Sequence, residues 1–307
     1  MHELPVLAIV LNYNGREVTL QTLQSLQELT YGDLEILVVD NGSSDGSLEA
    51  INERFPDVVQ VRTEQNLGAA GGLNLGLQRG LIGPYEYFLV LNNDIEVAPS
   101  LLSEMVKVAE SDETIGCVGP KSYYYGDRNR LWSAGGRICF REAVTKERGM
   151  GKIDRGQYDR DEEVDYVNGC AMLVRRNVLV EVGLFDPLFH LSVEDADWCM
   201  RMKELGYRSY YAHRARLWHM VSHTTGSYKP GRTFQTGRST ALFVRRYASP
   251  LQWTSFLLFL LAAIPAAFLR EAMKGNQAAV LSKLRGLWTG MRTPMTAPPS
   301  LGIDGAT

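Results

Sequence analysis

The chain has 307 residues, enough for one large α/β domain with an appendage. Its hydrophobic content of 45% and charged content of 22% are ordinary for a globular protein and exclude a disordered chain and a polytopic membrane protein. The four cysteines lack CxxC spacing, so neither a zinc ribbon nor a disulfide framework is expected, and a reducing cytoplasm fits.

Charge is distributed unevenly along the chain. Residues 228–307 contain ten Lys or Arg against two acidic residues, a net charge of +8, which leaves −11 for the first 227 residues. An acidic body suits cation binding. A basic C-terminal region suits an anionic membrane or a nucleic acid, and a solvated basic surface is the simpler alternative.

Short apolar runs rich in β-branched residues open the chain, at 6–11, 35–40, 58–62 and 87–91. Helix-compatible segments separate most of them. This alternation predicts right-handed βαβ units and an α/β fold with a Rossmann-like, mostly parallel sheet. Ligands of such sheets bind outside the carboxyl ends of the strands, so segments 12–14, 40–42 and 92–94 are expected to line the site.

The pattern changes after about residue 115, where short strands mix with Gly-rich and charged loops. A strand at 170–175, a helix at 194–205 and strands at 207–211 and 216–218 are predicted there. We place one catalytic domain at 1–228, a basic and apolar helical region at 229–292 and a disordered tail at 293–307.

Asp40 ends the second apolar run and enters the small-residue loop NGSSDGS. A carboxylate there can accept hydrogen bonds from a nucleotide base or ribose, although Asp40 and Asp45 can equally be turn or capping residues. Residues 66–76, NLGAAGGLNLG, either hold a diphosphate at a helix start or only pack closely. Neither GxGxxG after the first strand nor a P-loop motif is present, which argues against a dinucleotide dehydrogenase and a P-loop enzyme.

Asp94 follows the fourth apolar run, in the sequence VLNNDIEV. Mg²⁺ and Mn²⁺ are usually held by one or two carboxylates together with substrate phosphates, so Asp94 is a candidate ligand, with Asn92 adding a further oxygen. His219 ends a later predicted strand and can join Asp94 on the metal. The simpler alternatives are a turn for Asp94 and a structural role for His219.

Glu194, Asp195 and Asp197 open a predicted helix in SVEDADWCMRMKELG. The helix dipole favours acidic residues at this position, and Asp197 and Arg201 are spaced for an ordinary helical ion pair. These carboxylates are therefore either structural or part of a site that the strand ending at His219 completes.

Nine motifs in this order make the chain resemble glycosyltransferase family 2, most closely its bacterial rhamnosyltransferase-like members. They lie between about residues 5 and 225 and include VLNYNG, VVDNGSSDGS, LNNDIEV, VNGCAMLVRR and VEDADWCMRMKELGY. The resemblance implies a GT-A fold, with a nucleotide-sugar-binding half at 1–114 and an acceptor-side half at 115–228. It also implies inverting sugar transfer to an acceptor hydroxyl and a divalent cofactor, Mn²⁺ or Mg²⁺.

The resemblance also implies roles for individual residues. Asp195 is expected to be the general base, with Glu194 as the alternative. The expected metal ligands are Asp94 and His219, with Asn92 as a further ligand. Contacts to the nucleotide or donor are expected from Asn12, Asp40, Asn66, Gly68, Asn93 and Gly169. Contacts on the acceptor side are expected from Trp132, Trp198 and Arg201.

The expected donor is dTDP-rhamnose, with UDP and GDP sugars open, and the expected acceptor is a glycan or polyprenyl-linked sugar in cell-surface polysaccharide synthesis. No nucleic-acid partner is expected, and an oligomer is left open. The sequence departs from the family in FHLSVED before the acidic pair and in Arg238-Ser239, both on the acceptor side. Two other functions are considered: a GT-A module that binds nucleotide sugar or glycan without turnover, and a sugar-phosphate nucleotidyltransferase, whose usual signature near the first strand is missing.

Residues 251–269 contain no charged residue and are rich in Leu, Phe, Ala and Trp. Nineteen residues are close to the ~20 needed to span a bilayer as a helix. Pro265 interrupts the run and basic residues flank both ends, which favours a helix lying in the membrane interface over a span or a core or oligomer-interface helix. A protein peripheral to the cytoplasmic face of an anionic membrane is therefore expected.

Overall fold

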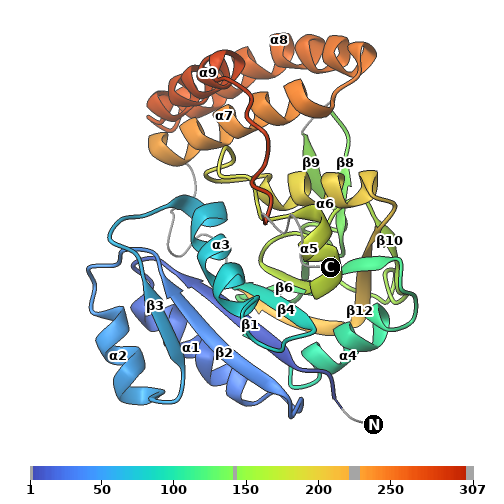
Figure 1. The fold of residues 1–307 in the computed structure, drawn as a ribbon. Helices are drawn as coiled ribbons and strands as arrows, with labels where there is room; N and C mark the ends of the chain where they lie inside the picture. The colour runs from blue at the N-terminus through green and yellow to red at the C-terminus, as the bar shows by residue number, and fades with distance from the viewer. Residues whose placement is uncertain (1–2, 141–143, 221–228, 302–307) are drawn as a thin grey trace.

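The structure, a computed structural model, describes residues 3–140, 144–220 and 229–301. Within these residues, ten strands form one mixed sheet, two short strands form a second, and the last three helices form a separate layer (Figure 1). The first elements in chain order are β1 (Val6–Asn12), α1 (Arg16–Gln27), β2 (Leu34–Asp40), α2 (Ser47–Arg54), β3 (Val59–Arg62), α3 (Gly68–Gly80) and β4 (Tyr87–Asn92).

The second part of the chain supplies mostly short strands and the helix with the acidic start. Its elements are β5 (Ile95–Val97), α4 (Leu101–Ala109), β6 (Ile115–Tyr124), β7 (Asp127–Ser133), β8 (Gly136–Ile138), β9 (Thr145–Glu147), β10 (Glu162–Val164), β11 (Ala171–Arg175), α5 (Arg176–Val182), α6 (Glu194–Glu204) and β12 (Arg208–His219).

The main sheet follows the order β10-β12-β6-β11-β4-β1-β2-β3. β1 pairs in parallel with both β2 and β4, and β2 pairs in parallel with β3, so the carboxyl ends of these strands lie at one edge. β11 runs antiparallel between β4 and β6, which makes the second half of the sheet mixed. The predicted α/β architecture with a mostly parallel sheet is confirmed.

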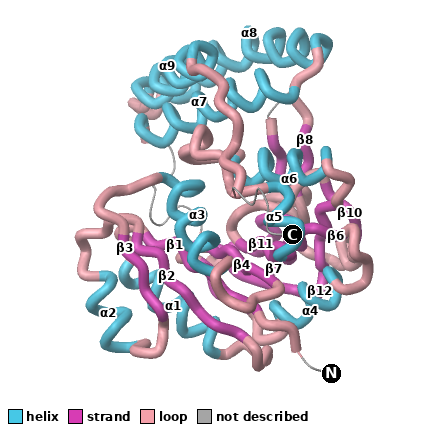
Figure 2. Tube along the Cα trace, in the orientation of Figure 1, coloured by secondary structure: helices cyan, strands magenta, loops and turns pink. Residues whose placement is uncertain are grey.

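Helices cover both faces of the sheet, as Figure 2 shows, and successive residues of β1 face opposite layers. Val6, Ala8 and Val10 pack in a core cluster with α1, α2 and α4. Leu7 and Ile9 pack in the other cluster with α3, α5 and α6. Because side chains alternate along a strand, a continuous apolar run of this length is buried on both faces.

One predicted break in the sheet is absent. The two strands predicted at 207–211 and 216–218 form the single strand β12, which pairs in parallel with β6. The pairing register shifts between Ala212 and Arg216, so that a bulge occupies the charged residues where the break was predicted. The strand then continues to His219, which brings this residue to the edge where β4 ends.

Three helices follow the catalytic region: α7 (Pro230–Tyr247), α8 (Pro250–Ala272) and α9 (Gln277–Arg292). In Figure 1 they form a layer beyond α6, away from β1–β3. α7 and α9 approach backbone to backbone because Gly237, Gly286 and Gly290 lie at their contact. A Cβ atom at Gly286 would lie 2.0 Å from the Phe234 carbonyl oxygen.

α8 is the outer helix of this layer, and it runs through Pro265 without a break, contrary to the interruption predicted there. Among the described residues it is the one helix long and apolar enough to cross a membrane by length and composition, which by itself is weak evidence for a span. Only 6% of its most apolar window is buried, so it is not a core helix of this chain.

α7 is bound to the loop and helix that carry the acidic motif. The Arg246 guanidinium donates to Oδ1 of Asp197 at 2.7 Å, lies 2.7 Å from Oδ2 of Asp186 and stacks over the Phe189 ring. The Ser239 hydroxyl donates to the Leu191 carbonyl at 2.8 Å. The appendage is therefore part of the wall that holds α6 in place.

The tail predicted to be disordered is ordered over its first part. The Leu184 N–H donates to the Pro299 carbonyl at 3.2 Å, and Leu301 packs against the apolar cluster of the catalytic region. Gly183 has a positive φ of 81°, and a Cβ atom there would lie 2.7 Å from the Pro299 carbonyl oxygen. A proline-rich segment keeps its extended form at low entropic cost, which favours this docking.

We predict that Arg246→Ala destabilises the protein by about 3–5 kcal/mol, because it leaves the fully buried Asp197 carboxylate with less compensation. Arg270→Ala is the matched control, since the Arg270 ion pair with Glu271 is solvent-exposed on the arginine side and should change stability by less than about 1 kcal/mol. Urea unfolding followed by circular dichroism measures both. Equal losses in the two variants would contradict the structural role of Arg246.

Candidate active site

The ends of β1, β2 and β4 are joined by one buried polar network. Asn12 donates from its side-chain amide to Oδ2 of Asp40 at 2.8 Å and to the Ser43 hydroxyl at 3.2 Å. Its amide oxygen accepts from the Thr19 hydroxyl at 2.8 Å and from the Asn93 amide at 2.9 Å. The structure therefore brings together three of the predicted donor residues, and it uses Asn12 and Asn93 to orient their neighbours.

Asp40 has no exposed surface and is held from several directions. Besides the Asn12 amide, the Ser43 N–H donates to Oδ1 at 2.9 Å, and the Arg62 Nε lies 3.9 Å from the same oxygen. Arg62 also donates to the Ser43 carbonyl at 3.0 Å. These contacts fix the carboxylate beneath the loop that follows β2. A nucleotide that binds Asp40 would share the carboxylate with Ser43 and Arg62.

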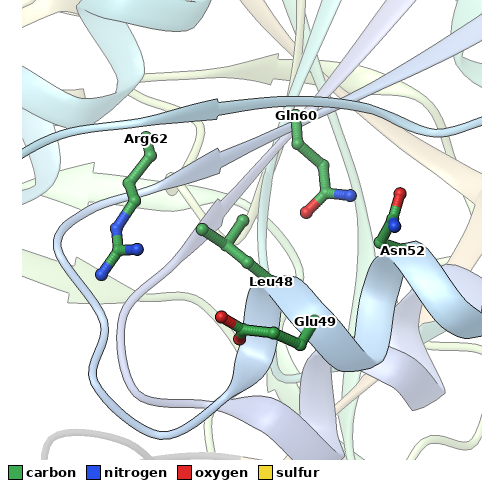
Figure 3. Close-up of a pocket in the computed structure, with 5 residues that line it drawn as sticks. All are labelled: Leu48, Glu49, Asn52, Gln60 and Arg62. Carbon is green, nitrogen blue, oxygen red and sulfur yellow. The ribbon is translucent and has the colours of Figure 1, made fainter.

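A surface pocket lies beside this loop, between α2 and β3 (Figure 3). Of its lining residues, only Arg62 also contacts Asp40. The pocket lies against β3, the last strand of the main sheet, and none of its lining residues is a predicted site residue. It is lined by Leu48, Glu49, Asn52, Gln60 and Arg62.

The glycine-rich segment serves packing at the start of α3. Three successive N–H groups are already paired: Leu67 donates to Oδ1 of Asn41, Gly68 to Oδ1 of Asn66, and Ala69 to the His190 carbonyl. This favours the packing alternative over a diphosphate held by these N–H groups. Gly68 has a φ of 78°, and a Cβ atom there would lie 2.6 Å from the His190 carbonyl oxygen, so only glycine fits.

Asp94 and His219 meet at the sheet edge, 125 residues apart in sequence. Antiparallel pairing of β12 with β5 sets His219 opposite Ile95, and the Met220 N–H donates to the Asp94 carbonyl at 2.8 Å. The His219 Nε2 lies 3.2 Å from Oδ1 of Asp94, and both residues are buried. Trp132 stands edge-on to the His219 ring, with 5.4 Å between ring centroids.

This pair fits a divalent metal site. An ion shared by the pair would be held by the His219 Nε2 and the carboxylate of Asp94, whose Oδ1 lies 3.2 Å from that nitrogen, while the buried Nδ1 on the other side of the ring has no hydrogen-bond partner. Over residues 3–140, 144–220 and 229–301, no cluster of three or more His, Cys, Asp and Glu side chains is suitable for a metal. A Mg²⁺ or Mn²⁺ ion held by Asp94 and His219 would take its other ligands from water or substrate phosphates, as these ions commonly do. His223, four residues further on, lies outside the described residues.

Asn92, the further predicted ligand, lies at the end of β4, and its N–H donates to the Cys170 carbonyl at 3.1 Å. The structure therefore uses its backbone to join β4 to the segment before β11. In that segment the Gly169 N–H donates to Oδ2 of Asp195 at 2.7 Å. Gly169 thus holds the predicted base, and the two strand ends place this base at the same edge of the sheet as Asp94.

Asp195 is delivered by a strained turn at the start of α6. Ser192 and Val193 have positive φ values of 70° and 61°, in a region that costs about 1–3 kcal/mol for residues with a Cβ atom. The turn directs the carboxylate of Asp195 toward the Gly169 N–H. Backbone strain of this kind is found where the surrounding packing holds a functional residue in place.

The two neighbouring carboxylates of α6 have different environments. Burial raises the pKa of Asp195 to about 6, and the Gly169 and Ala196 N–H groups oppose this rise. Burial and the charge of Asp195 raise the pKa of Glu194 to about 8, and its Oε2 is buried without a hydrogen-bond partner. At pH 7 the pair therefore carries its charge mainly on Asp195, which is poised to accept a proton.

Two residues predicted on the acceptor side lie elsewhere, and these predictions are corrected. Trp198 is 0% exposed, and its indole N–H donates to the Gly183 carbonyl at 2.9 Å. Arg201 binds Asp197 at 3.0 Å and donates to the carbonyls of Val182 and Leu184. Trp198 therefore offers no surface to an acceptor, and the Arg201 side chain, 12% exposed, is engaged in anchoring α6.

One residue near the site, Glu147 of the β8–β9 hairpin, was not predicted from the sequence. Glu147, at the end of β9, accepts hydrogen bonds from the Tyr166 hydroxyl at 2.6 Å and from the Asn168 amide at 3.0 Å. Asn168 is adjacent to Gly169 in the VNGC motif, which is the only local signal in the sequence. Nothing around Glu147 itself marks it, because its position depends on how the hairpin packs.

The fold and the site define a glycosyltransferase of the GT-A class that uses a nucleotide-sugar donor. Solved structures with the same fold include GalNAc-T7 with UDP, GalNAc and Mn²⁺, with a TM-score of 0.65 and 16% identity over 81% of this chain and 49% of that one. A mannosyltransferase from Pyrobaculum calidifontis, in complex with GDP-Man and Mn²⁺, matches with a TM-score of 0.60 and 17% identity over 95% of this chain and 88% of that one. At these identities the likeness shows the fold alone.

The chain belongs to glycosyl transferase family 2, whose sequence profile matches residues 7–183. A relative in Mycobacterium tuberculosis, N-acetylglucosaminyl-diphospho-decaprenol L-rhamnosyltransferase, is 26% identical over 82% of this chain and 88% of its own length. The poly-beta-1,6-N-acetyl-D-glucosamine synthase of Staphylococcus aureus is also 26% identical, over 81% of this chain and 58% of its own length. The sequence resemblance to this family is confirmed.

We predict that Asp94→Ala and His219→Ala each weaken Mn²⁺-dependent donor binding by more than ~10-fold, because each removes one side of the ion's protein ligand set. His213→Ala, on the same strand but paired with Asp161, is the matched control and should bind normally. Thermal shifts with dTDP-, UDP- and GDP-sugars, with and without Mn²⁺, measure the effect and rank the donors. Unchanged Mn²⁺-dependent shifts in both site variants would defeat the assignment.

Proposed function

We propose that this protein is an inverting, metal-dependent glycosyltransferase that moves L-rhamnose from dTDP-rhamnose to the hydroxyl of a lipid-linked glycan. The observation that carries the proposal is the placement of Asp195, whose pKa is raised to about 6, at the sheet edge that also holds Asp94 and His219. A base beside a metal-binding pair is the arrangement that a one-step sugar transfer needs.

In the proposed reaction, Asp195 removes the proton of the acceptor hydroxyl while the hydroxyl oxygen attacks the anomeric carbon of the donor. The Gly169 N–H keeps the carboxylate oriented during this step. The bond from the anomeric carbon to the diphosphate breaks, and a single in-line displacement inverts the centre without a covalent intermediate. A divalent ion on Asp94 and His219 would neutralise charge on the departing diphosphate.

The choice of donor and acceptor rests on the relative from Mycobacterium tuberculosis. That protein acts, by its name, on N-acetylglucosaminyl-diphospho-decaprenol and transfers L-rhamnose, and the match covers most of both chains. We transfer this chemistry as dTDP-rhamnose and a polyprenyl-diphosphate sugar in cell-surface polysaccharide synthesis. Trp132, which stands edge-on to His219, is the proposed acceptor-side aromatic.

Neither alternative function has an observation in its favour. A module that only binds nucleotide sugar has no use for a half-buried carboxylate held by a strained turn and a backbone N–H. A nucleotidyltransferase does not fit membership of glycosyl transferase family 2.

The membrane is the proposed location of the acceptor and of the enzyme. α8 exposes large apolar side chains, among them Leu258 at 63% and Leu261 at 73%. Arg270 and Lys274, near its end, have side chains exposed by 60% and 63%. Apolar side chains on an outer helix with exposed cations near its end suit an anionic bilayer interface, so we propose peripheral docking on the cytoplasmic face.

We predict that Asp195→Asn lowers transfer by ~10²–10⁴-fold while donor affinity stays within a few-fold, since a general base contributes in the transition state. Transfer by the wild type should fall as the pH decreases through about 6, because protonated Asp195 cannot accept the proton. The assay uses dTDP-L-rhamnose as donor and a short-chain polyprenyl-diphosphate N-acetylglucosamine as acceptor. A second assay uses the nucleotide sugar that gives the largest Mn²⁺-dependent thermal shift. Glu194→Gln tests the alternative base and should retain far more transfer than Asp195→Asn. Near-normal transfer by Asp195→Asn would move the base elsewhere.

We predict that the double variant Leu258→Glu with Leu261→Glu loses binding to anionic vesicles, because charged side chains oppose insertion of the apolar face of α8. Ile82→Glu with Leu205→Glu, at exposed apolar positions of the catalytic region, is the matched control and should still bind. Co-sedimentation of the full chain with phosphatidylglycerol and phosphatidylcholine vesicles at low salt tests this. If the wild type does not co-sediment with phosphatidylglycerol vesicles, the proposal of membrane docking is wrong.

A further inference from the structure

Glu147 is a carboxylate that the proposed mechanism does not use, although its charge acts on the proposed base and its hydrogen bonds reach the segment that holds this base. It ends β9, in the small two-stranded sheet β8–β9, which stands apart from the main sheet in Figure 1. The hairpin is attached to the segment before β11: the Gly136 N–H donates to the Tyr166 carbonyl at 3.0 Å, and the Asp165 N–H donates to the Gly136 carbonyl at 3.1 Å.

The Glu147 carboxylate accepts from three side chains: the Ser133 and Tyr166 hydroxyls and the Asn168 amide. The residue after Asn168 is Gly169, whose N–H holds Oδ2 of Asp195 at 2.7 Å. A continuous chain of contacts therefore runs from Glu147 through residues 166–169 to the proposed base. Two of these hydrogen bonds, from Tyr166 and Asn168, tie the segment to the carboxylate, and bonds to a charged acceptor are stronger than those between neutral groups.

The two carboxylates also interact through their charges. The titratable groups that face Asp195 are Glu147 from β9, Tyr166 and Cys170 from the segment leading into β11, and Glu194 on its own helix. Burial is the main cause of the raised pKa of Asp195, and the negative charge of Glu147 raises it further. Burial raises the pKa of the Tyr166 hydroxyl well above its usual range, with help from the charges of Glu147 and Asp195.

We propose that Glu147 is a positioning residue for the base: it fixes the 166–169 segment that holds Asp195 and places a second negative charge beside that carboxylate. The first effect sets the direction of the carboxylate, and the second makes the carboxylate a stronger proton acceptor. The Gly169 N–H has the opposite electrostatic effect, so Glu147 compensates for the acidity that the orienting bond imposes. The proposal rests on Asp195 as the base of the proposed function.

The decisive experiment is a titration of side-chain carboxyl groups by ¹³C NMR in the full chain, with the Asp195 resonance assigned from Asp195→Asn. Glu147→Gln removes the charge, and it should lower the Asp195 midpoint by about one pH unit. Ser133→Ala removes one hydrogen bond to Glu147 and keeps the charge, so the Asp195 midpoint should not move. An unchanged midpoint in Glu147→Gln would overturn the proposal.

Transfer kinetics supply the second readout. In Glu147→Gln, the acid limb of the kcat/KM profile should move to lower pH, because a less basic Asp195 stays unprotonated at lower pH. The value of kcat on the plateau should fall ~10-fold or more. A purely structural role would lower the plateau and leave the acid limb in place, which would refute the electrostatic part. Mn²⁺-dependent donor binding should not change.

A conservative variant guards against misfolding. Glu147→Asp keeps the charge and should retain an Asp195 midpoint closer to the wild type than Glu147→Gln does; a midpoint that follows Glu147→Gln instead would count against the proposal. Thermal unfolding of each variant reports whether the hairpin is intact. If Asp195→Asn transfers sugar normally, the proposed base fails, whereas the NMR midpoints still decide whether Glu147 acts on Asp195.

Discussion

Asn12 has no exposed surface, so every polar atom of its side chain must be paired inside the protein. It satisfies this requirement by binding Asp40, Ser43, Thr19 and Asn93, which lie on or beside the three central strand ends. The donor side of the site depends on this one side chain. Removing it would leave several buried groups unpaired at once, so the loops after β1, β2 and β4 are positioned together.

The acceptor side depends on a different constraint, a buried charge. Asp197 lies two residues after Asp195 and has no exposed surface, and it is compensated by Arg201 on α6 and Arg246 on α7. The C-terminal helices therefore stabilise the helix that carries the base. Because α8 follows α7 directly and α7 binds Asp197 through Arg246, one helix connects the proposed membrane contact to the acidic motif.

Electrostatics around the acidic pair are set first by burial and then by neighbouring negative charges. Burial together with the charge of Asp195 raises the pKa of Glu194 to about 8, and burial together with the charge of Glu147 raises that of Asp195 to about 6. Such a site is costly for folding, since a buried carboxylate is most stable when neutral. The raised pKa of Asp195 also lets this carboxylate accept the proton of the acceptor hydroxyl in the proposed transfer.

Local patterns in the sequence determined the first strands, the placement of Asp40 and Asp94 at strand ends and the placement of the acidic pair at a helix start, because apolar runs and helix-start signals are local along the chain. Ordered motifs also identified the family. Tertiary packing alone decided which face of α6 turns to the core, and so buried Trp198 and bound Arg201 to backbone carbonyls. It also decided that residues 293–301 dock and that a hairpin brings Glu147 to the base, since contacts between segments far apart in the chain follow from packing and not from local periodicity.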